Sequence, residues 1–252
     1  MLSGAVGVLI FCGQVTVKAL GIWDGAFLAR SHVTSIKLSL DFQEGLIFSI
    51  CTEQEARMYT VIGSLSTRAF RVVWMLEELG LRYTHLSVKP RSEEVLKYNP
   101  SGKVPVLLDG DTPITDSTAI MSYLGDKHGG LCFPTGTIER AQQDAFLHQV
   151  LDEIDAVLWT AARHSFVLPE EHRVPEIKPS LKWEFERNLN RLMDQMKGPF
   201  LMGDTFTVPD IILANCANWA EGARFPSDHE KFKTYVAEVR ARPAFQRVAS
   251  LS

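Results

Sequence analysis

The sequence has few cysteines, no dense basic cluster and no long hydrophobic run. Its four cysteines lie far apart among 252 residues, without a CxxC or Cys/His spacing. A disulfide scaffold and a metal site are therefore not expected, and a reducing compartment is favoured. Lys and Arg number 26 against 30 Asp and Glu, so nucleic acid is not expected as a ligand. No window reaches the roughly 18 apolar residues that span a bilayer, and no membrane partner is expected.

The first 57 residues differ from the rest of the chain. They hold short apolar stretches separated by glycines, without a sustained helical or strand period. The stretch at residues 5–12 has the length of a signal peptide, but the first basic residue, Lys18, follows it, so a secretory signal is not expected. We interpret residues 1–57 as a leader, a disordered arm or translation from an upstream start, and expect the compact protein to begin near Met58.

Strand and helix patterns alternate over residues 58–130. Tyr59–Gly63 has the composition of a strand, and the next apolar residues have helical spacing up to Gly80. The other elements predicted here are strands at 82–88, 104–109 and 112–115, and helices at 92–98 and 116–124. The order βαβαββα predicts a small α/β domain.

Residues 138–252 have helical patterns only. The helices predicted there span residues 138–166, 179–197, 232–242 and 244–248, with one more that begins at Thr207. Thr207 and Asp210 have the spacing of a capping box, in which two residues satisfy the free amides at a helix start. The sequence therefore predicts an all-helical second domain.

The turn between the first strand and helix of the α/β domain carries three hydroxyl groups, those of Ser64, Ser66 and Thr67. Free backbone N–H groups and the helix dipole favour an anion at such a place. The hydroxyl groups and the helix start would both stabilise a bound thiolate. Lowering the pKa of a thiol by roughly two units needs about 2.7 kcal/mol of such stabilisation. The alternative is that Ser66 or Thr67 only caps its helix.

Two further segments have features of a binding site. Pro105 at a strand start leaves the Val104 backbone able to pair with an extended ligand, unless this is an ordinary edge strand. Asp116 and Ser117 open another helix, where the acid suits an ammonium and the hydroxyl and its amide suit a carboxylate. Together they would suit an α-amino acid head group, or they only cap the helix.

The motifs NPSGKVPVLLDG, DSTAI and TVPD, in this order and spacing, make residues 58–252 resemble the glutathione S-transferase superfamily of cytosolic type. The resemblance implies a thioredoxin-like N-terminal domain that binds glutathione, and an all-α C-terminal domain that supplies the electrophile site. It also implies that the TVPD cap serves stability and not chemistry.

The resemblance assigns roles in glutathione binding to residues of the first domain. It implies a cis bond at Val104–Pro105, with the Val104 backbone pairing with the cysteinyl part of glutathione. It places Asp116 and Ser117 on the γ-glutamyl head, and Lys103 near the glycyl carboxylate.

The catalytic residue is expected in the first turn. Tyr59 is too early for the tyrosine classes, and no cysteine lies near the turn. Counting back from Gly80, the serine classes place their hydroxyl at Ser66, with Thr67, Ser64 or no side chain as the alternatives. Arg68 and Arg71 either add positive potential or are solvated, and Glu77 and Glu78 are expected on a solvated face.

The resulting hypothesis is a glutathione transferase that adds the glutathione thiolate to small hydrophobic electrophiles, in a detoxifying role. Glutathione is the co-substrate, no metal is needed, and a cytoplasmic homodimer is expected. The alternatives are a non-catalytic interaction protein of the same fold and a glutathione-dependent peroxidase or dehalogenase. An aromatic group either lines the electrophile pocket or belongs to the core: Trp159, His164, Phe166 and Trp183. Cys132 and Cys216 are expected to pack as small hydrophobic residues.

Overall fold

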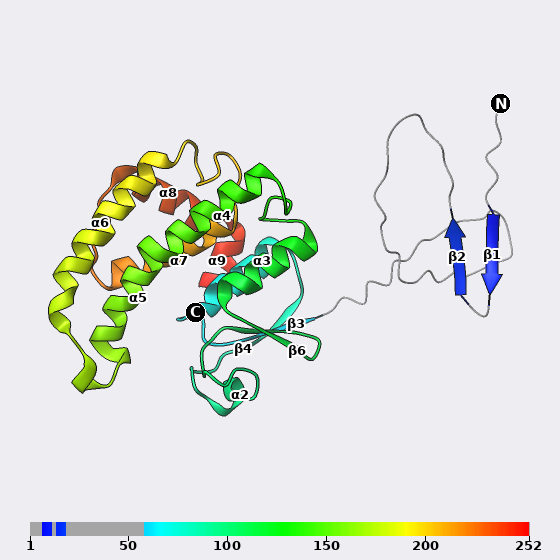
Figure 1. Cartoon of the computed structure of the whole chain (residues 1–252), viewed down its shortest axis with the longest axis horizontal. Helices are drawn as coiled ribbons and strands as arrows, with labels where there is room; N and C mark the ends of the chain where they lie inside the picture. Colours follow the sequence, from blue (N-terminus) through cyan, green and yellow to red (C-terminus); the bar gives the residue numbers. More distant parts are fainter. Residues whose placement is uncertain (1–6, 12–13, 19–57, 252) are drawn as a thin grey trace. The chain divides into compact units, whose positions relative to one another are not determined.

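The computed structural model describes residues 7–11, 14–18 and 58–251 (Figure 1), and the chain divides into two units, 1–56 and 57–252. In the first unit, β1 (Gly7–Phe11) pairs antiparallel with β2 (Gln14–Lys18). No strand was predicted there, because a short continuous apolar run such as Gly7–Phe11 has no period that identifies it. The leader, arm and signal-peptide interpretations fall mainly outside the described residues.

A four-stranded sheet forms the centre of the α/β domain. Its strands are β3 (Tyr59–Ile62), β4 (Tyr83–Leu86), β5 (Val106–Asp109) and β6 (Thr112–Thr115), in the order β4-β3-β5-β6. β3 and β4 are parallel, and the other two pairs are antiparallel. The sheet and its helices confirm the predicted thioredoxin-like α/β fold.

Three helices accompany this sheet: α1 (Ala69–Glu78), α2 (Glu93–Leu96) and α3 (Ser117–His128). α3 continues one turn beyond the predicted end at residue 124. It ends where Gly129 takes a left-handed conformation, with φ of 69°, a geometry that glycine adopts without steric cost.

The second half begins with one long helical segment, as predicted, but this segment is not uniform. It consists of α4 (Ile138–Val150), a π-helical turn (Leu151–Asp155), α5 (Ala156–Ala162) and a second π-helical turn (Arg163–Val167). Single π turns inside α-helices shift the faces of the turns that follow them.

The remaining helices complete the predicted all-helical half (Figure 1). They are α6 (Lys178–Gln195), α7 (Val208–Gly222), α8 (Glu230–Arg240) and α9 (Pro243–Ala249). Two short 3₁₀ turns, Glu170–His172 and Pro175–Ile177, connect the second π turn to α6. In the part of the chain that the structure describes, no helix has the length and apolar character to cross a membrane.

One hydrophobic core joins the α/β domain to the helices, with α1 at its centre. The Trp74 ring lies 5.0 Å from Phe245 of α9 and 5.8 Å from Phe206, between ring centroids. The fully buried side chains of α1 include Val72, Val73 and Leu76. α1 is therefore held from both halves, which fixes the turn before it.

The prediction that Glu77 and Glu78 are solvated was wrong. Glu78 accepts two hydrogen bonds of 2.7 Å from Arg242, and Glu77 accepts one of 2.5 Å from Arg247. Arg242 directly precedes α9 and Arg247 lies within it, each more than 160 residues further along the chain. These ion pairs tie α1 to the C-terminal helices.

Candidate functional site

The sheet register places the three predicted segments at one edge. Ile62, the last residue of β3, pairs with Val106, the first residue of β5, and Val106 pairs with Thr115, the last residue of β6. The residues after Ile62, before Val106 and after Thr115 therefore leave the sheet at the same edge. The hydroxyl turn, the Val104–Pro105 bond and the Asp116–Ser117 helix start lie together for this reason.

Gly63 marks the closest approach of two of these segments. A Cβ atom at Gly63 would lie 2.9 Å from the Val104 Cβ, a distance that side chains do not adopt, and its φ of +138° is unfavourable for other residues. Its carbonyl accepts a 2.7 Å hydrogen bond from His85 Nε2. Glycine here lets the turn lie directly against Val104.

The three hydroxyls of the turn have different surroundings. Thr67 Oγ1 donates to the Ser64 carbonyl at 2.6 Å and accepts from the Ala69 amide at 3.2 Å, so it caps α1. Ser66 is exposed, and its Oγ lies 2.9 Å from Ser64 Oγ. Ser66 is thus the hydroxyl of this turn that is both open to a ligand and not used by the helix.

The Val104–Pro105 peptide bond is cis, as the resemblance implied. Among the described residues, neither the N–H nor the C=O of Val104 has a hydrogen-bond partner. The loop before it is ordered by its own side chains: Asn99 Nδ2 donates to the Lys103 carbonyl at 2.9 Å. Lys103 itself is exposed. A strand-like ligand can pair with the Val104 backbone.

Asp116 and Ser117 open α3. Asp116 has a φ of 72°, and its Oδ1 accepts hydrogen bonds from the amides of Thr118 (2.9 Å) and Ala119 (3.1 Å). Asp116 therefore does cap α3, through one of its two carboxylate oxygens. Ser117 is 2% exposed, and its hydroxyl has no hydrogen-bond partner in the described part of the chain.

A buried charge cluster lies directly behind the hydroxyl turn. Asp155, at the end of the first π turn, forms ion pairs with Arg68 and, at 2.7 Å, with Arg71. Arg71 is fully buried and also donates to Asn215 Oδ1 at 2.7 Å. Of the two alternatives for these arginines, the solvated one does not hold for Arg71, because α7 and the long helical segment cover α1.

Electrostatics make this cluster one ionic unit. Burial alone would raise the pKa of Asp155, but the charges of Arg71 and Arg68 outweigh it and hold that pKa below its ordinary value. The Arg68 guanidinium lies between two indole rings, 5.1 Å from Trp159 and 5.0 Å from Trp219. Sequence reasoning missed Asp155 and Trp219. An acid beside the buried Ile154 was the available signal for the first.

Other predicted candidates lie elsewhere. Tyr59 lies at the opposite end of β3, and its hydroxyl is 2.8 Å from His128 Nε2. Cys216 is fully buried, and burial raises the pKa of its thiol to about 12, which suits a packing role. The aromatic candidates have different surroundings: Trp159 contacts Arg68, whereas Phe166 and Trp183 are exposed. No group of three metal-ligating side chains occurs within residues 58–251.

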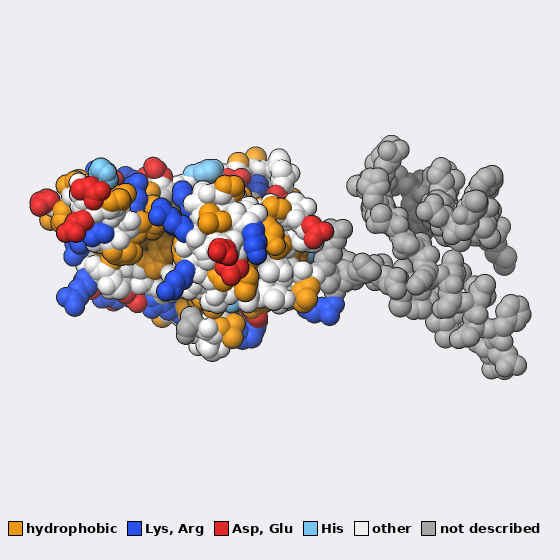
Figure 2. All heavy atoms as spheres, turned by 90° about the horizontal axis from the view of Figure 1, so that it is seen from below, with side chains coloured by type: hydrophobic (Ala, Val, Ile, Leu, Met, Phe, Trp, Pro, Cys, Tyr) orange, Lys and Arg blue, Asp and Glu red, His pale blue; other side chains and the backbone are white. Residues whose placement is uncertain are grey.

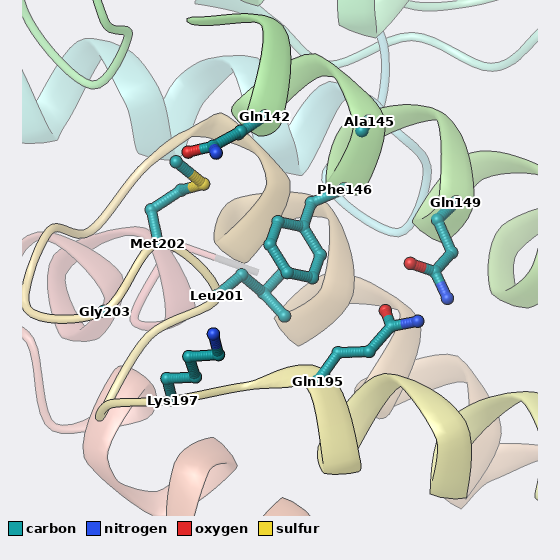
Figure 3. Close-up of a pocket in the computed structure, with 9 residues that line it drawn as sticks. All are labelled: Gln142, Ala145, Phe146, Gln149, Gln195, Lys197, Leu201, Met202 and Gly203. Atoms are coloured by element: carbon teal, nitrogen blue, oxygen red, sulfur yellow. The ribbon is translucent and has the colours of Figure 1, made fainter. Parts of the chain in front are cut away.

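A pocket of about 560 Å³ lies between α4, the end of α6 and the segment that follows it (Figure 3). Phe146 and Leu201 line it together with glutamines and Lys197. None of the predicted site residues belongs to its lining. This pocket is therefore separate from the sheet edge that carries the candidate site.

The α/β domain matches a known family model. Residues 65–127 match the model of the glutathione S-transferase N-terminal domain. This match covers the hydroxyl turn from Leu65 onward, the cis bond and the start of α3.

Longer similarities extend over both halves. The glutathione S-transferase GstA of Escherichia coli O157:H7 is 28% identical over 186 residues, which cover 69% of this chain and 89% of GstA. A glutathione transferase structure from Methylococcus capsulatus strain Bath has a TM-score of 0.68 and 26% identity, covering 77% of this chain and 98% of its own. URE2P6 of Phanerochaete chrysosporium, solved with oxidised glutathione, has a TM-score of 0.68 and 26% identity and covers 78% and 97%.

Proposed function

The chain belongs to the cytosolic-type glutathione S-transferase superfamily and is an enzyme of that class, and on this premise we propose that it activates glutathione for attack on small hydrophobic electrophiles. The observation that carries this proposal is the exposed Ser66 hydroxyl in a turn that lies against the cis Val104–Pro105 bond. A hydroxyl donor and a helix start there meet the requirement of a thiolate.

In the proposed mechanism, the Ser66 hydroxyl donates a hydrogen bond to the glutathione sulfur. The hydrogen bond favours the ionised thiol, and the N-terminal end of α1 adds positive potential. The thiol proton leaves to solvent, and the sulfur forms a bond to the electrophilic carbon while the leaving group departs or a π bond opens. Holding sulfur and carbon together lowers the barrier of a reaction between two molecules.

Glutathione is held along the sheet edge. Its cysteinyl backbone pairs with the N–H and C=O of Val104, beside Pro105. Ser117 and its amide bind the γ-glutamyl carboxylate, while Asp116 Oδ2 pairs with the ammonium and Oδ1 keeps its cap of α3. Lys103 is placed to attract the glycyl carboxylate. The unpartnered Val104 backbone and Ser117 hydroxyl support this assignment.

Three broader proposals accompany the mechanism. The enzyme acts as a cytoplasmic homodimer in detoxification. Residues 58–130 form the glutathione domain, residues 138–252 the electrophile domain, and residues 1–57 an extension. A chain shortened to begin at Met58 that still folds and binds glutathione supports the boundary; loss of folding refutes it.

Calorimetric titration of the purified chain with reduced glutathione tests the proposal. We expect binding in the micromolar to millimolar range, weakened about tenfold by Ser117→Ala, because a hydrogen bond to a charged group contributes about 1.5 kcal/mol. Thr118→Ala is the matched control, since it removes a hydroxyl from the same helix start. Absence of binding at high millimolar glutathione would support the non-catalytic alternative. With binding present, turnover of hydroperoxides rather than aryl halides would support the peroxidase alternative.

A further inference from the structure

Arg163, unlike Arg68 and Arg71, has no carboxylate partner in the described part of the chain, and one of its guanidinium nitrogens has no acceptor there. Its Nη2 donates to Thr160 Oγ1 at 2.9 Å, which is an uncharged acceptor. Its Nε is shielded from solvent and has no acceptor within residues 58–251. A half-buried guanidinium that is not neutralised favours an anion.

The position of Arg163 connects it to the hydroxyl turn. It lies one helical turn, about 5–6 Å along the axis, beyond Trp159 at the start of the second π turn. The Trp159 ring contacts the guanidinium of Arg68, which is two residues from Ser66. Ser66, Trp159 and Arg163 thus form a series that leads from the proposed sulfur position along α5.

Neighbouring cations are already satisfied. Arg68 and Arg71 share Asp155, and Arg173 donates to the backbone carbonyls of Leu168 (2.7 Å) and Phe166 (3.4 Å). Among these arginines, Arg163 is the one whose Nε has no acceptor in the described part of the chain. Figure 2 shows apolar side chains on one face of the molecule, with Lys, Arg, Asp and Glu side chains around them.

We propose that the electrophile is an apolar or aromatic compound with a carboxylate, which Arg163 binds while the apolar body lies against Trp159. This inference rests on the proposed transferase function and narrows its substrate class. A planar guanidinium binds a carboxylate through two parallel hydrogen bonds, and the indole offers a flat apolar surface. The pair selects an anionic electrophile over its neutral analogue.

Two conjugates that differ at one substituent, a carboxylate or its methyl ester, test the inference. 4-Chloro-3-nitrobenzoate and its methyl ester react with glutathione by the same substitution, in which a C–S bond forms, the C–Cl bond breaks and chloride leaves. The probes are the two purified glutathione conjugates, titrated calorimetrically into the full chain. Variants Arg163→Gln and Arg163→Lys are compared with Arg173→Gln, which removes a neighbouring charge of the same segment.

We expect the wild-type chain to bind the carboxylate conjugate about tenfold more tightly than the ester conjugate. Arg163→Gln removes this ratio, Arg163→Lys keeps part of it, and Arg173→Gln keeps all of it. Equal affinity for the two conjugates, or a ratio that survives Arg163→Gln, overturns the inference and leaves the transferase proposal intact. Failure of both conjugates to bind overturns both proposals.

Discussion

A threonine hydroxyl or backbone lies at the start of both α1 and α7, yet the polar residues at the two helix starts serve different purposes. At α7, Thr207 and Asp210 are 1% and 0% exposed, and a capping box joins them. At α1, Thr67 closes the helix start while Ser66 remains exposed. The comparison teaches that burial, and not the type of side chain, separates a stabilising cap from a binding hydroxyl.

The hydrogen bonds of the polar groups at these two helix starts differ in the same way. Asp210 accepts from the Leu201 amide (3.0 Å), the Thr207 amide (2.9 Å) and the Tyr235 hydroxyl (3.1 Å). The Ser66 hydroxyl contacts only the neighbouring Ser64 hydroxyl in the described part of the chain. A polar group whose hydrogen bonds are all made within the protein stabilises the fold. A hydroxyl that can form further hydrogen bonds can bind a ligand.

Removal of the buried cap should have the largest effect. Asp210→Ala leaves the buried amides of Leu201 and Thr207 and the Thr207 hydroxyl without their carboxylate acceptor, so we expect a loss of about 3 kcal/mol in the free energy of unfolding at pH 7. Urea denaturation measures this loss. A stability within 0.5 kcal/mol of wild type, roughly the effect of a surface substitution, would contradict the assigned role.

The pH dependence of Asp210 gives a control. Burial raises its pKa in the folded state from 3.8 to about 6. Between these values the folded state keeps the proton that the unfolded state loses, so the stability from this group is full below about pH 4 and declines until about pH 6. Against Asp210→Asn, the wild type should lose about 3 kcal/mol over this interval. If the stabilities of the two proteins change with pH in parallel, the raised pKa of Asp210 is refuted.

Ser66→Ala should affect chemistry and leave stability unchanged. Loss of a hydrogen bond to the thiolate would raise the pKa of bound glutathione by up to about two units, toward the ordinary value of about 8.5, and lower the rate at pH 7 by up to about 25-fold. Glutathione affinity and the denaturation midpoint should stay near their wild-type values, because the side chain is exposed. The thiolate absorbance of bound glutathione against pH measures the pKa directly. Unchanged turnover would remove Ser66 from the mechanism.

Thr67→Ala should have the smallest effect, and it distinguishes most clearly between the roles of the Thr67 and Ser66 hydroxyls. Its Oγ1 caps α1, so we expect a loss of about 1 kcal/mol in stability, with the pKa of bound glutathione unchanged. Thermal unfolding and the same absorbance titration measure both. A large rise in the thiol pKa for this variant would assign catalysis to Thr67 and reverse the comparison.

Local patterns predicted most of the fold. Strand β3, helix α1 and the hairpin around Asp109 and Gly110 follow from residue spacing and turn residues, which act within a few positions of the chain. The helix-start motifs at Asp116 and Thr207 were recognised for the same reason. The pairing of Gly7–Phe11 with Gln14–Lys18 was not predicted, because the apolar run of the first strand has no period.

Contacts between distant residues were not predicted. Arg71 and Asp155 are 84 positions apart, the difference of their residue numbers, and Glu78 and Arg242 are 164 apart. Nothing in the sequence near Arg71 shows that α7 will cover it. The same limit applies to Arg163, whose neighbours in sequence do not reveal that its charge lacks a partner.

For residues 58–251, local sequence patterns were therefore enough to predict the order of the main helices and strands, the helix caps and the residues of the candidate site at the sheet edge. Only the tertiary structure decided which of three adjacent hydroxyls is exposed, which arginines are neutralised and which backbone groups lack partners. The reason is physical: helix and strand preferences depend on neighbours along the chain, whereas burial and charge pairing depend on which segments the folded chain brings together.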